Sequence, residues 1–173
     1  MSSEHRGRTT GRGFRLVEIL LVAGVLVVLS TIAGAKLNMA ATTSGEAKMR
    51  EDLRFVRTQV RVYSMHHHGL VPGFPGGDAK AAPTEAAFVE QLTMATDDRG
   101  NTTAAGGGRL RWGPYLANIP ENPVSGKTGV TILSAEEPLV ADGMTAWLYQ
   151  PSTGQLKPNV SGTDSEGHLF SDY

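Results

Sequence analysis

Three consecutive histidines, His66, His67 and His68, are the residues of this chain best suited to metal chemistry. Each imidazole can ligate zinc or another transition metal. Their spacing argues against a shared ion, because consecutive residues on a helix point about 100° apart. The dipole of a helix also favours cationic histidines near its C-terminus. We therefore expect a structural role for this triplet, with a histidine-dependent metal enzyme as the alternative.

The sequence contains no motif that indicates another kind of catalytic site. The chain contains no cysteine, which excludes disulfides, cysteine-ligated metals and thiol nucleophiles. Gly106–Gly108 follows no predicted strand and lacks a Gly-Lys-Ser/Thr sequence, so it is not a phosphate loop. No Ser/His/Asp set or carboxylate pair stands out. We expect a protein that is not an enzyme and needs no cofactor.

A long apolar stretch near the N-terminus contains one informative acid. From Ile19 to Ala35 no residue is charged. If the stretch is extended back to Phe14, the only charged residues that it gains are Arg15 and Glu18. At about 1.5 Å per residue, a helix over residues 14–35 reaches roughly 33 Å, close to the ~30 Å hydrocarbon thickness of a bilayer. The stretch therefore predicts a single transmembrane helix over residues 14–35.

The alternative is a secretory signal peptide that ends at the small residues Ala33-Gly34-Ala35, before Lys36. The apolar stretch is longer than the usual 7 to 15 residues of such peptides. Glu18 also has no use in a signal peptide, whereas a carboxylate beside hydrocarbon requires a cationic partner. These two features favour an anchored helix.

Residues 13–18, Gly-Phe-Arg-Leu-Val-Glu, resemble the processing site of type IV pilins and of the pseudopilins of type II secretion. The resemblance implies that a prepilin peptidase cuts after Gly13, which makes residues 1–13 a cleaved leader peptide. It implies N-methylation of the new terminus at Phe14. It also implies that Glu18 neutralises this amino terminus in a neighbouring subunit during filament assembly.

Two residues depart from the family's usual sequence, and a second region of the chain is similar to the family. Arg15 stands where the family more often has a small or apolar residue, and Ala35 stands where many pilins have proline. From Trp112, the sequence WGPYLANIPENPVSG is similar to a loop in relatives of the major pseudopilin. Many true pilins carry a C-terminal disulfide, so the missing cysteines favour a pseudopilin.

The resemblance also implies location, partners and one candidate ion. The protein would be a single-pass protein of the bacterial inner membrane, with its head on the periplasmic or extracytoplasmic side. Its partners would be the prepilin peptidase, copies of itself and other pseudopilins, the inner-membrane assembly platform and the lipid bilayer. Major pseudopilins often bind calcium in a C-terminal loop. Asp164 and Glu166 are the first candidates here, but the family's ligand pattern is not matched, and we expect no metal.

Residues 36–68 predict an amphipathic stem helix that ends near Gly69. Its apolar positions recur at alternating spacings of four and three, which defines one helix face. These positions are Met49, Leu53, Val56, Val60 and Tyr63. The arginines between them are Arg50, Arg54, Arg57 and Arg61. No aromatic residues are interleaved with them to stack on bases, so a solvated basic face is favoured over nucleic-acid binding.

Residues 69–173 predict a globular α+β head, in which a short helix capped by Thr84 and a small antiparallel sheet pack on the stem. The expected strands are 130–133, a weak one at 139–141, 146–150 and 155–160, with a hairpin turn at 151–154. The head carries a formal charge of −6 (6 basic, 12 acidic residues) and residues 36–68 carry +3 (6 basic, 3 acidic). A structural filament subunit is the leading interpretation. The alternative is an exported or anchored ligand-binding module that forms no filaments.

Overall fold

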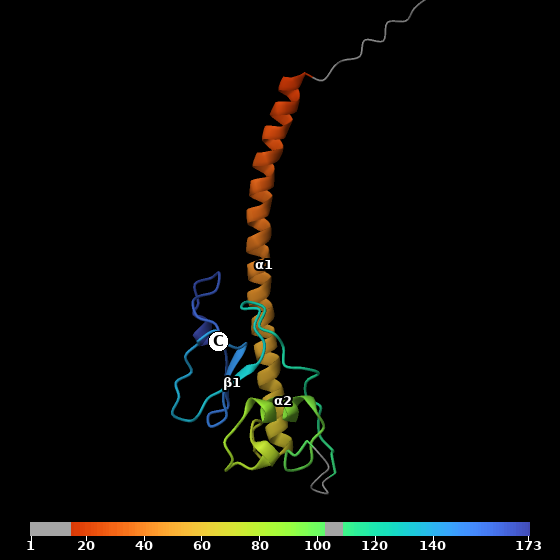
Figure 1. Cartoon of the computed structure of the whole chain (residues 1–173), viewed down its shortest axis with the longest axis vertical. Helices are drawn as coiled ribbons and strands as arrows, with labels where there is room; N and C mark the ends of the chain where they lie inside the picture. The colour runs from red at the N-terminus through yellow and green to blue at the C-terminus, as the bar shows by residue number, and fades with distance from the viewer. Residues whose placement is uncertain (1–14, 103–108) are drawn as a thin grey trace, which may run out of the picture. The chain divides into compact units, whose positions relative to one another are not determined.

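The computed structural model describes residues 15–102 and 109–173, with only the backbone described for residues 31–38. The elements in chain order are α1 (Leu16–His66), the 3₁₀ turn η1 (Pro75–Gly77), α2 (Glu85–Thr93), β1 (Val130–Ile132), β2 (Trp147–Gln150), β3 (Gln155–Pro158) and the 3₁₀ turn η3 (Phe170–Asp172). Figure 1 shows these elements along the chain. The chain divides into two units, Met1–Ala40 and Ala41–Tyr173, and α1 contributes to both. The predicted α+β class is confirmed.

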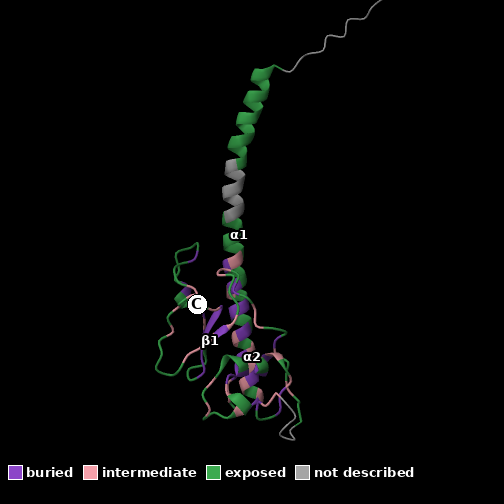
Figure 2. Ribbon diagram, viewed as in Figure 1, coloured by how far each residue is buried: buried purple, intermediate pink, exposed green. Residues whose placement is uncertain are grey.

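The second unit is built around the predicted apolar face of α1. Met49, Leu53, Val56, Val60 and Tyr63 are all 6% exposed or less, so the predicted face is confirmed. Figure 2 shows this buried stripe along the part of α1 that belongs to the unit. The stripe shares one core with apolar residues of α2 and of the sheet, namely Phe88, Leu92, Val130, Trp147, Tyr149 and Leu156.

The sheet has three strands in the order β1-β2-β3. β2 and β3 are antiparallel and joined by the predicted turn, in which Gly154 has a positive φ of 67°. β1 pairs with β2 in parallel, with Val130 opposite Trp147, so the prediction of an antiparallel sheet is wrong for this pair. The reason is the long connection of residues 133–146, which carries the chain back to the end at which β1 began.

The weak strand expected at residues 139–141 is absent, and these residues form part of that connection. Pro138 offers no backbone N–H to a ladder, and Val140 is 69% exposed, so it packs against no sheet face. The side-chain amide of Gln150 holds the connection instead, because it donates to the carbonyl oxygens of Ser134 (2.8 Å) and Glu137 (2.9 Å).

α1 ends slightly before the predicted position. The last helical residue is His66, so His67 and His68 lie beyond the helix that was expected to reach residue 68. His68 adopts a left-handed φ of 55°, and the Gly69 N–H donates to the Ser64 carbonyl at 2.8 Å. This six-to-one bond closes the helix in the manner of a Schellman motif.

The short helix α2 begins as predicted, because the Thr84 hydroxyl accepts from the Ala87 N–H at 3.2 Å. Its buried Gln91 then ties down two loops. The Gln91 side chain accepts from the Gly73 N–H and donates to the carbonyl oxygens of Phe74 and Gly100. These bonds fix the Gly/Pro-rich loop that follows α1 against α2.

Candidate functional site

The predicted processing residues Gly13 and Phe14 lie outside the described residues, whereas Glu18 lies within them, in the first turn of α1. The Glu18 side chain is exposed, and its carboxylate accepts from the backbone N–H of Arg15 at 3.1 Å. Arg15 precedes the first helical residue, so this contact is the returning half of a capping box. In the isolated chain, Glu18 therefore satisfies one of the unpaired donors at the helix N-terminus.

The apolar side chains that follow Glu18 are uncovered. Every large aliphatic residue from Ile19 to Leu29 is 50–66% exposed, on all sides of the helix. Within the described part of the chain, no helix combines the length and the hydropathy that a bilayer crossing requires. Phe14 and the side chains of residues 31–35 lie outside the description, and the span over residues 14–35 stays a prediction.

The C-terminal loop is organised around the buried carboxylate of Asp164. One oxygen accepts from the backbone N–H groups of Glu166 (2.9 Å) and His168 (2.8 Å). The other oxygen accepts from the Tyr173 hydroxyl and lies 3.6 Å from the Arg50 guanidinium. The hydrogen bond from Tyr173, helped by the two backbone donors and opposed by burial, holds the pKa of Asp164 well below its usual range.

Two further contacts tie this loop to α1. The buried Glu46 carboxylate accepts from both the backbone N–H (2.9 Å) and the hydroxyl (2.6 Å) of Ser165. The Arg50 guanidinium also lies 5.3 Å from the centroid of the Tyr173 ring. The C-terminal loop is therefore fastened to the helix by charged groups from both sides.

The two calcium candidates, Asp164 and Glu166, lie close together, but the carboxylate of Asp164 already accepts hydrogen bonds from the protein. Asp164, Glu166 and His168 offer ligand atoms within 4.8 Å of one another. Both oxygens of Asp164 accept hydrogen bonds from the protein, whereas Glu166 and His168 are exposed. The backbone donors and the Tyr173 hydroxyl would compete with an ion for these oxygens. The arrangement supports a structural role for Asp164 and assigns no metal.

Asp164→Asn is expected to release the C-terminal loop from α1. An asparagine side chain offers one acceptor oxygen where the carboxylate accepts with two, and its NH₂ group would face the donors that the second oxygen now binds. Amide exchange in residues 161–173, followed by mass spectrometry, should approach the rate of an unstructured peptide. Glu166→Gln is the matched control, because its carboxylate is exposed; equal exchange in the two variants would contradict this role.

The three histidines face different surroundings. His66 stacks on Trp112 with ring centroids 4.2 Å apart, and its Nδ1 lies 3.1 Å from the Tyr115 hydroxyl. His67 is buried, with Nδ1 2.7 Å from the Tyr63 carbonyl oxygen and Nε2 2.9 Å from the Thr96 hydroxyl. His68 is exposed. Since a carbonyl only accepts, Nδ1 of His67 carries the proton, and Nε2 is free to accept from Thr96. The triplet does not converge on a common ligand position.

The stability of the head is expected to decrease below about pH 6.5, the ordinary histidine value. Burial lowers the pKa of His67, so the unfolded chain binds its proton at a higher pH than the folded chain does. The contribution of neutral His67 to the free energy of unfolding is complete above the pKa that this histidine has in the unfolded chain. It decreases as the pH falls toward the pKa that it has in the folded chain. Denaturant unfolding between pH 5 and 8 measures this slope. His67→Gln should flatten it, and an unchanged slope would contradict the assignment.

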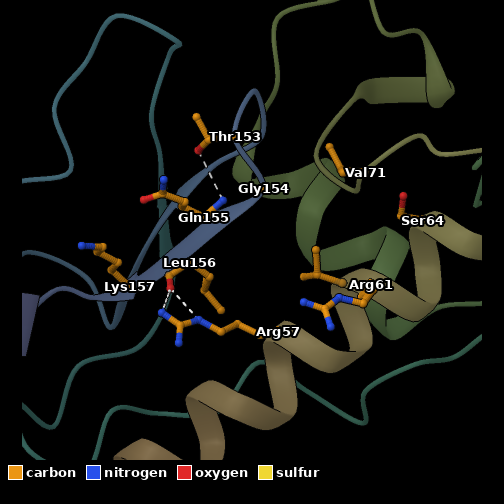
Figure 3. A pocket seen from close by; sticks show the side chains of 10 residues that line it. Arg57, Arg61, Ser64, Val71, Thr153, Gly154, Gln155, Leu156 and Lys157 are labelled. Atoms are coloured by element: carbon orange, nitrogen blue, oxygen red, sulfur yellow. Dashed lines mark hydrogen bonds between the residues drawn. The ribbon is translucent and has the colours of Figure 1, made fainter. Parts of the chain in front are cut away.

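The four arginines of the stem do not form one solvated face. Arg50 pairs with Asp164, and Arg57 donates to the carbonyl oxygens of Leu156 (2.6 and 3.0 Å) and Tyr173 (2.7 Å). Arg54 and Arg61 are exposed. Figure 3 shows Arg57 bonded to Leu156, with Arg61 on the same side of α1. The expectation of a wholly solvated basic face is therefore wrong for Arg50 and Arg57, which hold the C-terminal loop and β3.

Sequence reasoning missed the anchoring roles of Glu46, Arg50 and Tyr173. Only Arg50 and its partner Asp164 carried a signal, opposite charge at distant positions, and many other pairs share it. Comparisons with family models, with curated proteins and with solved structures found no match for this chain. Its function is therefore inferred from its own residues.

Proposed function

We propose that this chain is a structural subunit of a pilin-like filament, most similar to the major pseudopilin of type II secretion. It is cleaved after Gly13, N-methylated at Phe14, and assembled through α1 into a secretion pseudopilus or a type IV pilus-like fibre. Prepilin peptidase, the inner-membrane assembly platform and further copies or other pseudopilins are the partners.

The observation that carries the proposal is the uncovered apolar surface of α1 directly after the Gly13–Glu18 motif. At roughly 25 cal/mol for each Å² of apolar surface removed from water, such a surface strongly favours a cover of lipid or of other helices. A helix that is apolar on all sides is typical of a bilayer or of a bundle interior. A filament supplies first one environment and then the other.

The second unit supports the same proposal. α1 extends without a break from the apolar stretch into the core, where its buried face packs with α2 and the sheet. One helix thereby connects the assembling segment to the head covalently. The polar anchors at Glu46 and Arg50 fasten the C-terminal loop to that helix.

Sedimentation of sheared fibres tests the proposal. The chain is produced in a host that carries the secretion platform, with and without its prepilin peptidase. We expect fibres that contain the chain only when the peptidase is present. A chain that is exported and soluble in both hosts would instead support the ligand-binding module.

A further inference from the structure

A groove of about 510 Å³ lies between α1 and the β2–β3 hairpin. We call it the basic groove, because Arg57, Arg61 and Lys157 line it and no carboxylate does. Its other lining includes the apolar side chains of Val60, Val71 and Leu156. Figure 3 shows Arg57 and Arg61 on the helix side and Lys157 on the strand side.

No Asp or Glu side chain forms an ion pair with these cations in the described part of the chain. Arg57 donates to the main-chain oxygens of Leu156 and Tyr173, and the Lys157 ammonium donates to the Ser171 carbonyl at 2.6 Å. The Arg61 side chain is exposed and makes no hydrogen bond or ion pair with another described residue. Three other cations of the described residues do pair with acids, namely Lys48 with Asp52, Arg50 with Asp164 and Arg111 with Asp98. The groove therefore presents a local excess of positive charge above an apolar floor.

The complementary surface lies on the connection between β1 and β2. Residues 134–140, here called the acidic loop, contain Glu136, Glu137 and the 69% exposed Val140. The Glu137 carboxylate accepts from the Ser134 N–H at 2.6 Å, and the Gln150 side chain holds two carbonyls of the loop. Glu136 is exposed and has no partner among the described residues. The loop is thus held in shape with one carboxylate left available for a partner.

We propose that the basic groove of one copy receives the acidic loop of a neighbouring copy, with Glu136 placed against Arg61. The inference rests on the proposed function, because a filament brings such copies together. The loop of the same copy is held at the end of β2 by Gln150, and none of its residues lines the groove. A contact between two different surfaces does not close on itself, so its repetition generates a helical filament.

Cysteine cross-linking of assembled full-length chains tests this contact, and the natural absence of cysteine gives a clean background. One tagged copy carries Gln155→Cys at the exposed wall of the groove, and a second, differently tagged copy carries Ala135→Cys in the loop. Both substitutions leave the charges intact. Oxidation is expected to produce a dimer that contains both tags, which an intrachain bond cannot produce.

Charge reversal then identifies the pair. Arg61→Glu in the groove copy, or Glu136→Arg in the loop copy, should each lower the mixed dimer about tenfold, because like charges then face each other. The two reversals combined should restore the yield. Arg54→Glu is the matched control, because Arg54 is exposed on the same helix and does not line this groove.

Three results would overturn the contact. The first is the absence of the mixed dimer from assembled fibres. The second is an equal yield of mixed dimer for Arg61→Glu and Arg54→Glu. The third is that Arg61→Glu loses binding to phosphatidylglycerol vesicles while its cross-linking is unchanged, which would make the groove a lipid site. Fibres that form from chains starting at Phe14 without the mixed dimer contradict only this contact. Chains that neither start at Phe14 nor form fibres contradict the proposed function itself.

Discussion

Replacement of Glu18 by alanine is expected to abolish fibre assembly while cleavage after Gly13 continues at the normal rate. Within the proposed filament, the carboxylate neutralises the amino terminus of a neighbouring Phe14, and an ammonium left unpaired in an apolar bundle is strongly unfavourable. In the same proposal, the peptidase acts on a single chain after Gly13, so we expect cleavage to need no partner subunit. Sheared-fibre yield and the mass of the membrane-bound chain measure the two steps separately.

Glu18→Gln separates the two roles of this side chain. The amide oxygen can still accept from the Arg15 N–H, as the carboxylate does at 3.1 Å, but it carries no charge. We expect Glu18→Gln to assemble as poorly as Glu18→Ala. Glu51→Gln is the control, because Glu51 is an exposed acid on the same helix. Normal assembly of Glu18→Gln would mean that helix capping is the whole contribution of Glu18.

Phe88→Ala is expected to lower the free energy of unfolding of the head by about 3–5 kcal/mol, the usual loss for a buried phenylalanine. The Phe88 side chain is fully buried, with its ring centroid 4.7 Å from that of Tyr149. The same substitution at Phe55, which is 52% exposed on α1, should change the free energy by at most about 0.5 kcal/mol.

The two phenylalanine variants are compared in detergent-solubilised full-length chain by guanidinium unfolding. Tryptophan fluorescence reports the transition, because Trp147 is fully buried in the core cluster. Equal losses for both variants would contradict the described core. An unchanged Phe88→Ala chain would show that α2 does not pack on the sheet.

The parts of the fold that depend on local patterns could be predicted from the sequence. The alternating spacing from Met49 to Tyr63 identified the buried face of α1, because helical periodicity does not depend on distant residues. The Thr84 cap and the turn before Gln155 were likewise identified from neighbouring residues. Each of these signals lies within a few positions of the feature that it predicts.

The remaining features depend on distant contacts. The parallel pairing of β1 was missed, since a run of β-branched residues such as Val130–Ile132 fits either direction equally well. α1 ends at His66 and not at residue 68, and both His68 (φ 55°) and Gly69 (φ 89°) have left-handed backbone beyond it. The fastening of Asp164 to Arg50 joins residues far apart in the chain, and their charges alone did not pair them.

N-terminal peptide and intact-mass analysis shows where the mature chain begins. The protein is purified from membranes of a host that contains a prepilin peptidase. We expect a chain that begins at N-methylated Phe14 and lacks residues 1–13. A chain that begins at Lys36 would show cleavage by an ordinary signal peptidase after Ala35. That result would contradict the filament subunit and leave an exported α+β module.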